Sequence, residues 1–399
     1  MMSSSYFSFL FSFLLLLNSS DTVPVKKETK QWFKGNLHTH SYWSDGDEFP
    51  EMIMDWYKTH DYDFVALSDH NTMARGEKWI KVIKSRMYEE AFDKYLNKFG
   101  TEWVTYKTDS GRTHVKLKTF PEYKQRFEDK GFLILPSEEI TDRFEGKPIH
   151  VCATNLQTLL PPQGGSSVTE TMQRNVDAVL KQRNETGIPM FPHINHPNFY
   201  YAISTQDMIG LHGERFFEVY NGHPLVHNEG DSLHPGTERM WDEINLAYFK
   251  RHQPLLLGLA TDDSHSYHQF GTAYSNAGRG WVMVYADSLE AHTLIGAMER
   301  GDFYASSGVT LKNVSVRKNT ILVEVEPETG VNYTIEFVGV TAASEKATVL
   351  KRVTGTKAKF QLTAQHFFVR ARVSSTKMKP NPYRDKELEM AWTQPVVFE

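Results

Sequence analysis

The sequence predicts a (β/α) barrel followed by a smaller antiparallel β domain. Short apolar runs alternate with helical patterns through most of the chain, and run after run ends in His, Asp or Glu. Parallel strands buried on both faces have this apolar character, and functional groups gather at their C-terminal ends. Beyond about Gly308, apolar and polar residues alternate, as is typical of antiparallel strands. A doubly wound open sheet is the alternative for the first part. The barrel is favoured because side chains from many strands must converge on one point.

Length and composition exclude several classes of protein. The 399 residues have room for two domains. The formal net charge is -5 and Lys and Arg form no cluster, which argues against a long nucleic acid as partner. Cys152 is the only cysteine, so an intrachain disulfide and a thiolate metal cage are both excluded. Any bound metal must therefore have nitrogen and oxygen ligands.

The first 20 residues are interpreted as a cleaved signal peptide. Residues 7–17 form a continuous run of Phe, Leu and Ser, whose length suits a signal sequence better than a membrane span. An uncleaved anchor is the alternative, because no Lys or Arg precedes Lys26. We therefore expect a secreted or periplasmic protein with no stable membrane span after cleavage.

The first predicted strand carries the first candidate metal ligands. Residues 32–40 read as a strand that contains His38 and His40. Because side chains two residues apart share one face of a strand, both imidazoles can reach one metal ion. Asp45 follows in a loop, where it can supply an oxygen ligand. Alone, the pattern also fits a strand with two surface histidines.

Helical patterns separate the apolar runs. We expect helices at residues 50–59, 77–99, 168–184 and 288–300, the third closed by Gly187. Residues 77–130 form an insertion in the barrel. The insertion either covers a site as a lid or lies on the surface without a functional role. The predicted domains are the barrel at residues 31–308 and the β domain, a sandwich, at residues 309–399.

The later apolar runs repeat the pattern of the first. Residues 64–67 form an apolar run that precedes His70, and residues 132–135 form one that precedes Glu138 and Glu139. The run 149–156 contains His150, and the run 189–191 precedes His193 and His196. The run 215–220 contains Glu218 and precedes Asn221, and the run 255–260 precedes Asp262, Asp263 and His265. Such an ordered series is far more specific than any single His-x-His pair.

This series resembles the PHP (polymerase and histidinol phosphatase) superfamily over about residues 33–307. The signal sequence and trailing β domain look most like its secreted branch. The resemblance implies a distorted (β/α)7 barrel that holds two or three divalent metal ions. It implies as ligands His38, His40, Asp45, His70, Glu139, His150, His196, Asp263 and His265. By analogy, the first ion takes His38, His40, Glu139 and Asp263, the second Asp45, His70 and His265, and the third Glu139, His150 and His196.

Mixed imidazole and carboxylate ligands suit Zn, Mn or Fe and fit poorly with Ca or Mg. Paired ions lower the pKa of a bound water to about 7, which makes hydroxide available at neutral pH. We therefore expect a hydrolase that uses metal-bound hydroxide on phosphoesters, as a phosphatase or phosphodiesterase. The alternatives are a carboxylic or carbamic ester hydrolase at the same site, and a non-catalytic metal- or carbohydrate-binding module. The expected partner is a small-molecule phosphoester or ester.

Further side chains near the ligands are weaker candidates. His193 is interpreted as a general acid or a packed histidine, and Asp69 and Asp262 as groups that orient ligands or cap turns. Arg75 and Arg143 are candidate phosphate-binding residues, and Glu218 and Asn221 are candidate substrate contacts.

Overall fold

A computed structural model describes Met1 and residues 30–83 and 86–398. Within these residues, seven strands form a barrel. They are β1 (Gln31–Asn36), β2 (Phe64–Leu67), β6 (Leu133–Phe144), β7 (Lys147–Thr154), β8 (Phe191–Ile194), β9 (Phe216–Asn221) and β10 (Leu257–Thr261). Their spatial order is β10-β9-β8-β7-β6-β2-β1. The barrel closes where Thr39 and Ser264 form a parallel bridge and Asp263 N donates to His38 O at 2.9 Å. Apart from Met1, the predicted signal peptide lies outside the described residues.

One barrel strand runs against the others. β7 pairs antiparallel with both β6 and β8, whereas the remaining barrel pairs are parallel. The expectation of parallel strands throughout is therefore wrong at β7. The reason is a tight hairpin, in which Glu145 and Gly146 both adopt left-handed φ angles, of 48° and 79°. The start of β7 consequently lies at the rim where its neighbours end, so His150 reaches the same rim as the ligands that follow the other strands.

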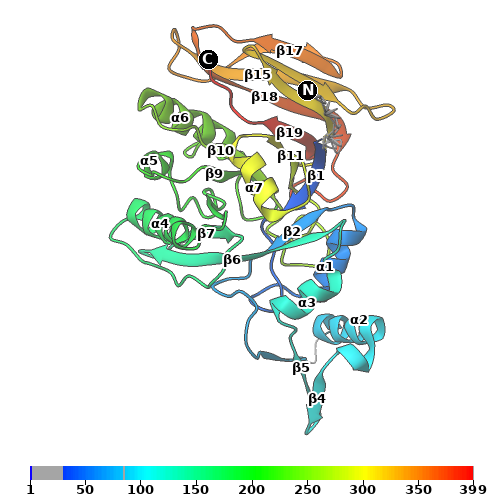
Figure 1. Cartoon of the computed structure of the whole chain (residues 1–399). Helices are drawn as coiled ribbons and strands as arrows, with labels where there is room; N and C mark the ends of the chain where they lie inside the picture. Colours follow the sequence, from blue (N-terminus) through cyan, green and yellow to red (C-terminus); the bar gives the residue numbers. More distant parts are fainter. Residues whose placement is uncertain (2–29, 84–85, 399) are drawn as a thin grey trace.

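Helices surround the barrel (Figure 1). They are α1 (Pro50–Thr59), α4 (Val168–Thr186), α5 (Thr205–Ile209), α6 (Thr237–Lys250) and α7 (Ala291–Glu299). The predicted bounds of α1 are confirmed, and Gly187 ends α4 with a φ of 68°, as expected for a C-cap glycine. Sequence periodicity did not predict α6. Among the described residues, no helix combines the length and the apolarity that a bilayer crossing needs.

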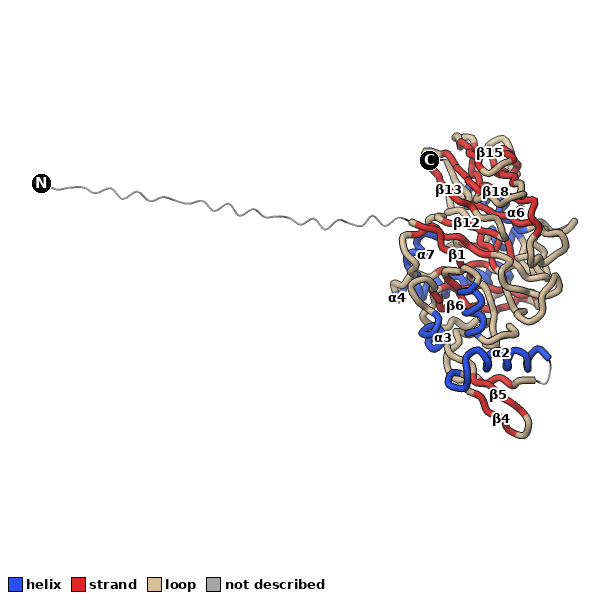
Figure 2. Tube along the Cα trace, turned by 90° about the vertical axis from the view of Figure 1, so that its right-hand side faces the viewer, coloured by secondary structure: helices blue, strands red, loops and turns tan. Residues whose placement is uncertain are grey.

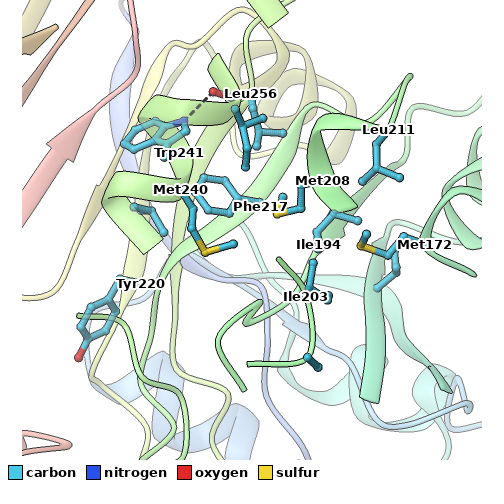
Figure 3. Close-up of a cluster of buried hydrophobic side chains, with 14 of the residues drawn as sticks. Met172, Ile194, Ile203, Met208, Leu211, Phe217, Tyr220, Met240, Trp241 and Leu256 are labelled. Carbon is cyan, nitrogen blue, oxygen red and sulfur yellow. Dashed lines mark hydrogen bonds between the residues drawn. The ribbon is translucent and has the colours of Figure 1, made fainter. Parts of the chain in front are cut away.

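A buried cluster between the helices and the barrel fixes β8 and β9 (Figure 3). Ile194 of β8 and Phe217 of β9 pack with Met172 of α4 and Trp241 of α6. The Trp241 indole Nε1 donates to Leu256 O at 2.8 Å, so its polar atom is also satisfied. Full burial of such a side chain stabilises the fold by about 1.5–3 kcal/mol. This packing fixes β8, which precedes His196, and β9, which contains Glu218.

The insertion differs from its prediction. It contains β3 (Trp79–Lys81), α2 (Arg86–Trp103), β4 (Tyr106–Asp109), β5 (Arg112–Lys116) and α3 (Phe120–Phe127). A helix starting near residue 77 is wrong because Trp79–Lys81 pairs antiparallel with β5, a long-range contact that local periodicity does not report. The insertion packs on the loop that carries Asp45: Tyr95 stacks on Phe49 at 4.1 Å, and Trp43 Nε1 donates to Lys118 O at 2.9 Å.

The C-terminal strands form the predicted antiparallel β sandwich, at the end of the molecule opposite to α2 and β4 (Figures 1 and 2). One sheet continues from the barrel through β11 (Trp281–Ala286), β12 (Phe303–Ser306), β19 (Leu388–Thr393), β18 (His366–Met378), β15 (Tyr333–Thr341) and β16 (Thr348–Thr354). The other contains β13 (Leu311–Arg317), β14 (Thr320–Val325) and β17 (Lys357–Gln361). Val323 and Phe337, one from each sheet, share the buried cluster between them.

Candidate metal centre

The predicted ligands converge at one rim of the barrel. The two imidazoles that follow β1 face each other, with His38 Nε2 3.1 Å from His40 Nε2. Asp263, two residues after the end of β10, places Oδ1 3.2 Å from His38 Nε2 and 3.3 Å from His40 Nε2. Three side chains from opposite ends of the barrel sequence therefore meet at one point.

Glu139 of β6 lies at the centre of the group. Its carboxylate oxygens lie 2.7–3.5 Å from nitrogens of five imidazoles, those of His38, His40, His70, His150 and His196. A carboxylate has two oxygens, so it can contact two ions at once. The structure thus places Glu139 where the resemblance to the PHP superfamily implied a bridging ligand.

The outer part of the centre is formed by Asp45 with His70 and His265. Asp45 Oδ2 lies 3.5 Å from His70 Nε2, and Oδ1 lies 3.4 Å from His265 Nε2. With His40 these residues form a set whose ligand atoms all lie within 4.8 Å of one another. It matches the second ligand set implied by the resemblance, with His40 added.

The third implied set is arranged differently in the structure. The ligand atoms of Glu139 and His150 group with His70, whereas those of His196 group with His38 and Asp263. Nevertheless, Glu139 Oε1 lies 2.9 Å from His150 Nδ1 and 3.3 Å from His196 Nε2. All nine predicted ligands are thus brought together, while the division of ligands between ions stays a prediction.

The donor set fits divalent ions. Six imidazoles and three carboxylates surround one buried region, an arrangement suited to a multi-metal site. Burial, reinforced by positive charge on His265 and His70, lowers the pKa of His40 to about 3, so this imidazole is neutral and able to bind a metal. Burial would raise the pKa of Glu139, but His70, His150 and His38 hold it well below its usual range. The carboxylate is therefore ionised.

Asp69 and Gly46 fix the loop that presents Asp45. The buried Asp69 carboxylate accepts hydrogen bonds from Ser41 N at 2.8 Å, Ser41 Oγ at 2.7 Å and Ser44 Oγ at 2.6 Å. A Cβ at Gly46 would lie 2.5 Å from the carbonyl carbon of His40, so only glycine permits this close turn. Asp69 thus acts through the loop rather than through His70, its neighbour in sequence.

Glu218 and Asn221 do not lie where a substrate could reach them, contrary to their interpretation as substrate contacts. Both are fully buried. Glu218 Oε1 lies 2.7 Å from His38 Nδ1, and Oε2 accepts from His196 N at 2.8 Å. The Asn221 amide Nδ2 donates to Glu218 Oε2 at 2.8 Å and to Asp263 Oδ2 at 3.1 Å. The two residues contact His38, His196 and Asp263 from the buried side of the centre.

The structure agrees with the second interpretation given for each of Asp262 and His193, a carboxylate that caps a turn and a packed histidine. The Asp262 carboxylate points away from the centre, accepting from Tyr57 OH at 2.8 Å and from Arg279 N at 2.6 Å. His193 is fully buried beneath the ligands, with Nε2 3.4 Å from Glu218 Oε1. Burial lowers its pKa, but Cys152 and Glu218 outweigh this effect and raise it to about 9. Neither side chain can meet a leaving group from solvent.

Arg75 and Arg143 lie on the surface. Their side chains make no hydrogen bond or ion pair within residues 30–83 and 86–398. Contact with a phosphate stays a prediction for both.

Three residues next to the candidate ligands were not predicted from the sequence. Asn195 Nδ2 donates to Glu139 Oε1 at 2.6 Å, and Asn195 Oδ1 accepts from Cys152 N at 2.8 Å. The His223 ring lies 5.6 Å from that of His265, and burial lowers the pKa of His223 to about 4. The Phe199 ring lies 5.0 Å from that of His196. The sequence positions of two of them could have indicated a place near the centre. Asn195 lies between His193 and His196, and His223 follows β9.

A seven-stranded barrel with one reversed strand, nine converging ligands and an appended β sandwich agrees with the architecture implied by the resemblance. The fold is PHP-like. No protein-family model matches the chain, and no curated relative matches it.

Three solved structures are similar to this chain. The first, from Bacteroides vulgatus, is described as a two-domain protein containing a predicted PHP-like metal-dependent phosphoesterase. It is 16% identical, covers 92% of this chain and 96% of its own, and gives a TM-score of 0.41. The second, a candidate metal-dependent phosphoesterase from Bifidobacterium adolescentis, is 12% identical, with coverages of 61% and 90% and a TM-score of 0.30. The third, an amidohydrolase from Chromobacterium violaceum with bound sulfate and no metal, is 11% identical, with coverages of 61% and 90% and a TM-score of 0.28.

Proposed function

We propose that this chain is a multinuclear metal-dependent hydrolase that acts on phosphoesters through metal-bound water. The observation that carries the proposal is the position of Glu139, whose carboxylate lies within 3.5 Å of nitrogens from five histidines. A structural role alone does not require so many imidazoles around one buried carboxylate. A single carboxylate shared by neighbouring ions is the arrangement of multinuclear hydrolases.

Bound divalent ions would lower the pKa of a coordinated water to about 7 and neutralise charge that develops on the substrate. The protein supplies the geometry for this chemistry. His38, His40 and Glu139 are fully buried, whereas the side chains of His265, His70 and Asp45 are 20%, 24% and 57% exposed. A substrate therefore approaches from the side of Asp45, and the buried side holds the ligands rigid.

Phosphoesters are favoured over carboxylic and carbamic esters because the overlapping groups of candidate ligands suit a site for more than one ion. A phosphoryl group has several oxygens that share the developing negative charge, and closely spaced ions can neutralise more than one of them. A carbonyl group develops charge on a single oxygen, for which one ion is enough. We further propose that the substrate is a small molecule and that the chain is exported, on the support of the apolar residues 7–17.

The test is hydrolysis of nitrophenyl phosphate, bis-nitrophenyl phosphate and nitrophenyl acetate by purified protein, with and without added Mn or Zn. We expect metal-dependent release of nitrophenol from at least one phosphoester, faster than from the acetate. Glu139→Gln should abolish it. Glu138→Gln is the matched control, because Glu138 is the neighbouring residue of β6 and its side chain accepts from Leu160 N instead, at 2.7 Å. Activity on the acetate alone would contradict the phosphoesterase, and inactivity on all three with metal bound would favour a binding module.

A further inference from the structure

The outer edge of the metal centre is a closed series of five rings. The centroid distances are 5.5 Å from His70 to His150, 6.4 Å from His150 to Phe199, 5.6 Å from Phe199 to His223, 5.6 Å from His223 to His265, and 6.2 Å from His265 back to His70. Three of these rings belong to predicted ligands. Phe199 and His223 do not, so one side of the edge is formed by residues outside the predicted ligand set.

The five rings lie on the solvent side of the centre. His38 and His40, below them, are fully buried, whereas Phe199 and His223 are half-buried and the His150 side chain keeps 11% of its surface exposed. A substrate that reaches the ions must pass along this edge. On the side of Phe199 and His223 it meets an apolar ring and a second flat ring instead of charged ligands.

Tyr200 extends the apolar side outward. Its ring lies 4.5 Å from that of Phe199, and the residue is 65% exposed. Phe199 and Tyr200 thus present two adjacent rings at this edge, one half-buried and one exposed. Tyr200 and Tyr201 both adopt left-handed φ angles, of 50° and 51°. Such a conformation is costly for non-glycine residues and persists only where the surroundings enforce it.

Contacts of the Tyr201 ring stabilise this backbone conformation. Its ring stacks on His234 at 3.9 Å and lies 5.0 Å from the ring of His227. With Tyr201 fixed in this way, the turn presents the Tyr200 ring outward beside Phe199. The strain in the backbone is thus used to hold one aromatic ring at the edge of the metal centre.

We propose that Phe199 and Tyr200 form a stacking subsite for the leaving group, so that the preferred phosphoesters carry a planar aromatic ring next to the phosphoryl group. The inference rests on the proposed phosphoesterase function and names its substrate class. Aromatic rings stack face to face with an offset or edge to face, and such contacts add to the burial of apolar surface. A saturated leaving group of the same charge lacks the stacking part of this interaction.

The test compares the binding of phenylphosphonate and methylphosphonate, which the protein cannot hydrolyse as esters, to the Mn-loaded protein by calorimetry. We expect wild-type protein to bind phenylphosphonate about tenfold more tightly than methylphosphonate, the typical effect of one aromatic stacking contact. Tyr200→Ala should reduce this preference severalfold, and Tyr200→Phe should keep it because the ring remains. Tyr285→Ala, which removes an exposed tyrosine of β11 that lies against Trp32, is the control and should also keep it.

The metal content of every variant is measured by elemental analysis, so that a lost ion is not mistaken for a lost stacking contact. Equal binding of the two phosphonates by wild-type protein would overturn the subsite, as would an unchanged preference in Tyr200→Ala. If the metal-loaded protein binds neither phosphonate, the phosphoesterase proposal itself fails. The two failures are therefore distinguishable.

Discussion

Glu218 Oε1 lies 2.7 Å from His38 Nδ1, and both side chains are fully buried. Burial alone would raise the pKa of Glu218, but His38 and His193 hold it well below its usual range, so the carboxylate is ionised and can only accept. Nδ1 of His38 therefore carries a hydrogen, and Nε2, which faces His40 and Asp263, is the nitrogen left to bind a metal. Glu218 fixes both the tautomer and the orientation of a metal-binding imidazole.

Glu218→Gln should weaken metal binding, because the neutral amide no longer holds the His38 tautomer as firmly. The expected loss of metal affinity is about 10–100-fold. Competition with a chromophoric chelator measures it. Glu138→Gln again serves as control, since it replaces another buried carboxyl of the barrel, on β6, whose side chain accepts from Leu160 N instead. Wild-type affinity in Glu218→Gln would contradict the assigned role.

Glu139→Ala should remove more than one metal ion per chain. Its carboxylate lies 3.5 Å from His38 Nε2 and 2.9 Å from His150 Nδ1, in two different ligand sets. A ligand that serves a single ion would leave the other sites filled. Elemental analysis of the purified variant measures the loss, and full metal content would show that Glu139 is no ligand at all.

Chelation should lower the thermal stability of the protein. Without ions, the folded chain keeps the buried imidazoles and carboxylates of the centre but loses the free energy that metal binding would contribute to folding. An ion that binds the folded chain at a hundred times its dissociation constant stabilises the fold by about 2.7 kcal/mol. Calorimetric scans with EDTA and with added Mn measure the shift. An identical melting temperature in both would mean that the centre binds no ion under these conditions.

The convergence of the candidate ligands could be predicted from the sequence because each is local to an apolar run. His38 follows a strand, His70 follows the next, and Asp263 follows the last, so strand order alone brings them to one rim. The antiparallel direction of β7 has no comparable local signal, since its apolar character is the same in either direction. His150 nevertheless lies with the other candidate ligands, where the order of motifs led us to expect it.

The supporting contacts could not be predicted, because their partners are distant in the chain. Glu218 and His38 are separated by 180 residues, and nothing near Glu218 distinguishes a ligand-orienting carboxylate from a substrate contact. Asp262 adjoins a ligand in sequence, yet its side chain points to Tyr57 and Arg279 N. The backbone at Asp263 is left-handed, with a φ of 49°, so the two neighbouring side chains point in different directions and closeness in sequence to a candidate ligand misled the interpretation.

Glu214→Gln should stabilise the protein at alkaline pH and leave it almost unchanged at acid pH. Glu214 is buried and accepts a hydrogen bond from Tyr248 OH. Burial outweighs this bond and raises the pKa of Glu214 from 4.5 to about 7. The folded chain therefore retains a proton that the unfolded chain has released. This contribution to stability is complete below pH 4.5 and is lost as the pH rises through 7.

The pKa difference corresponds to about 3 kcal/mol, which wild-type protein loses and Glu214→Gln keeps, because glutamine does not titrate. Urea unfolding of both proteins at pH 4.5 and pH 8.5, with EDTA present to exclude metal effects, measures the difference between them. Glu185→Gln changes an exposed carboxyl of α4 and is the matched control. Because every other titrating group is common to the two proteins, their stability difference isolates Glu214. A difference that stays constant between the two pH values would mean that Glu214 ionises in the fold as it does in the unfolded chain.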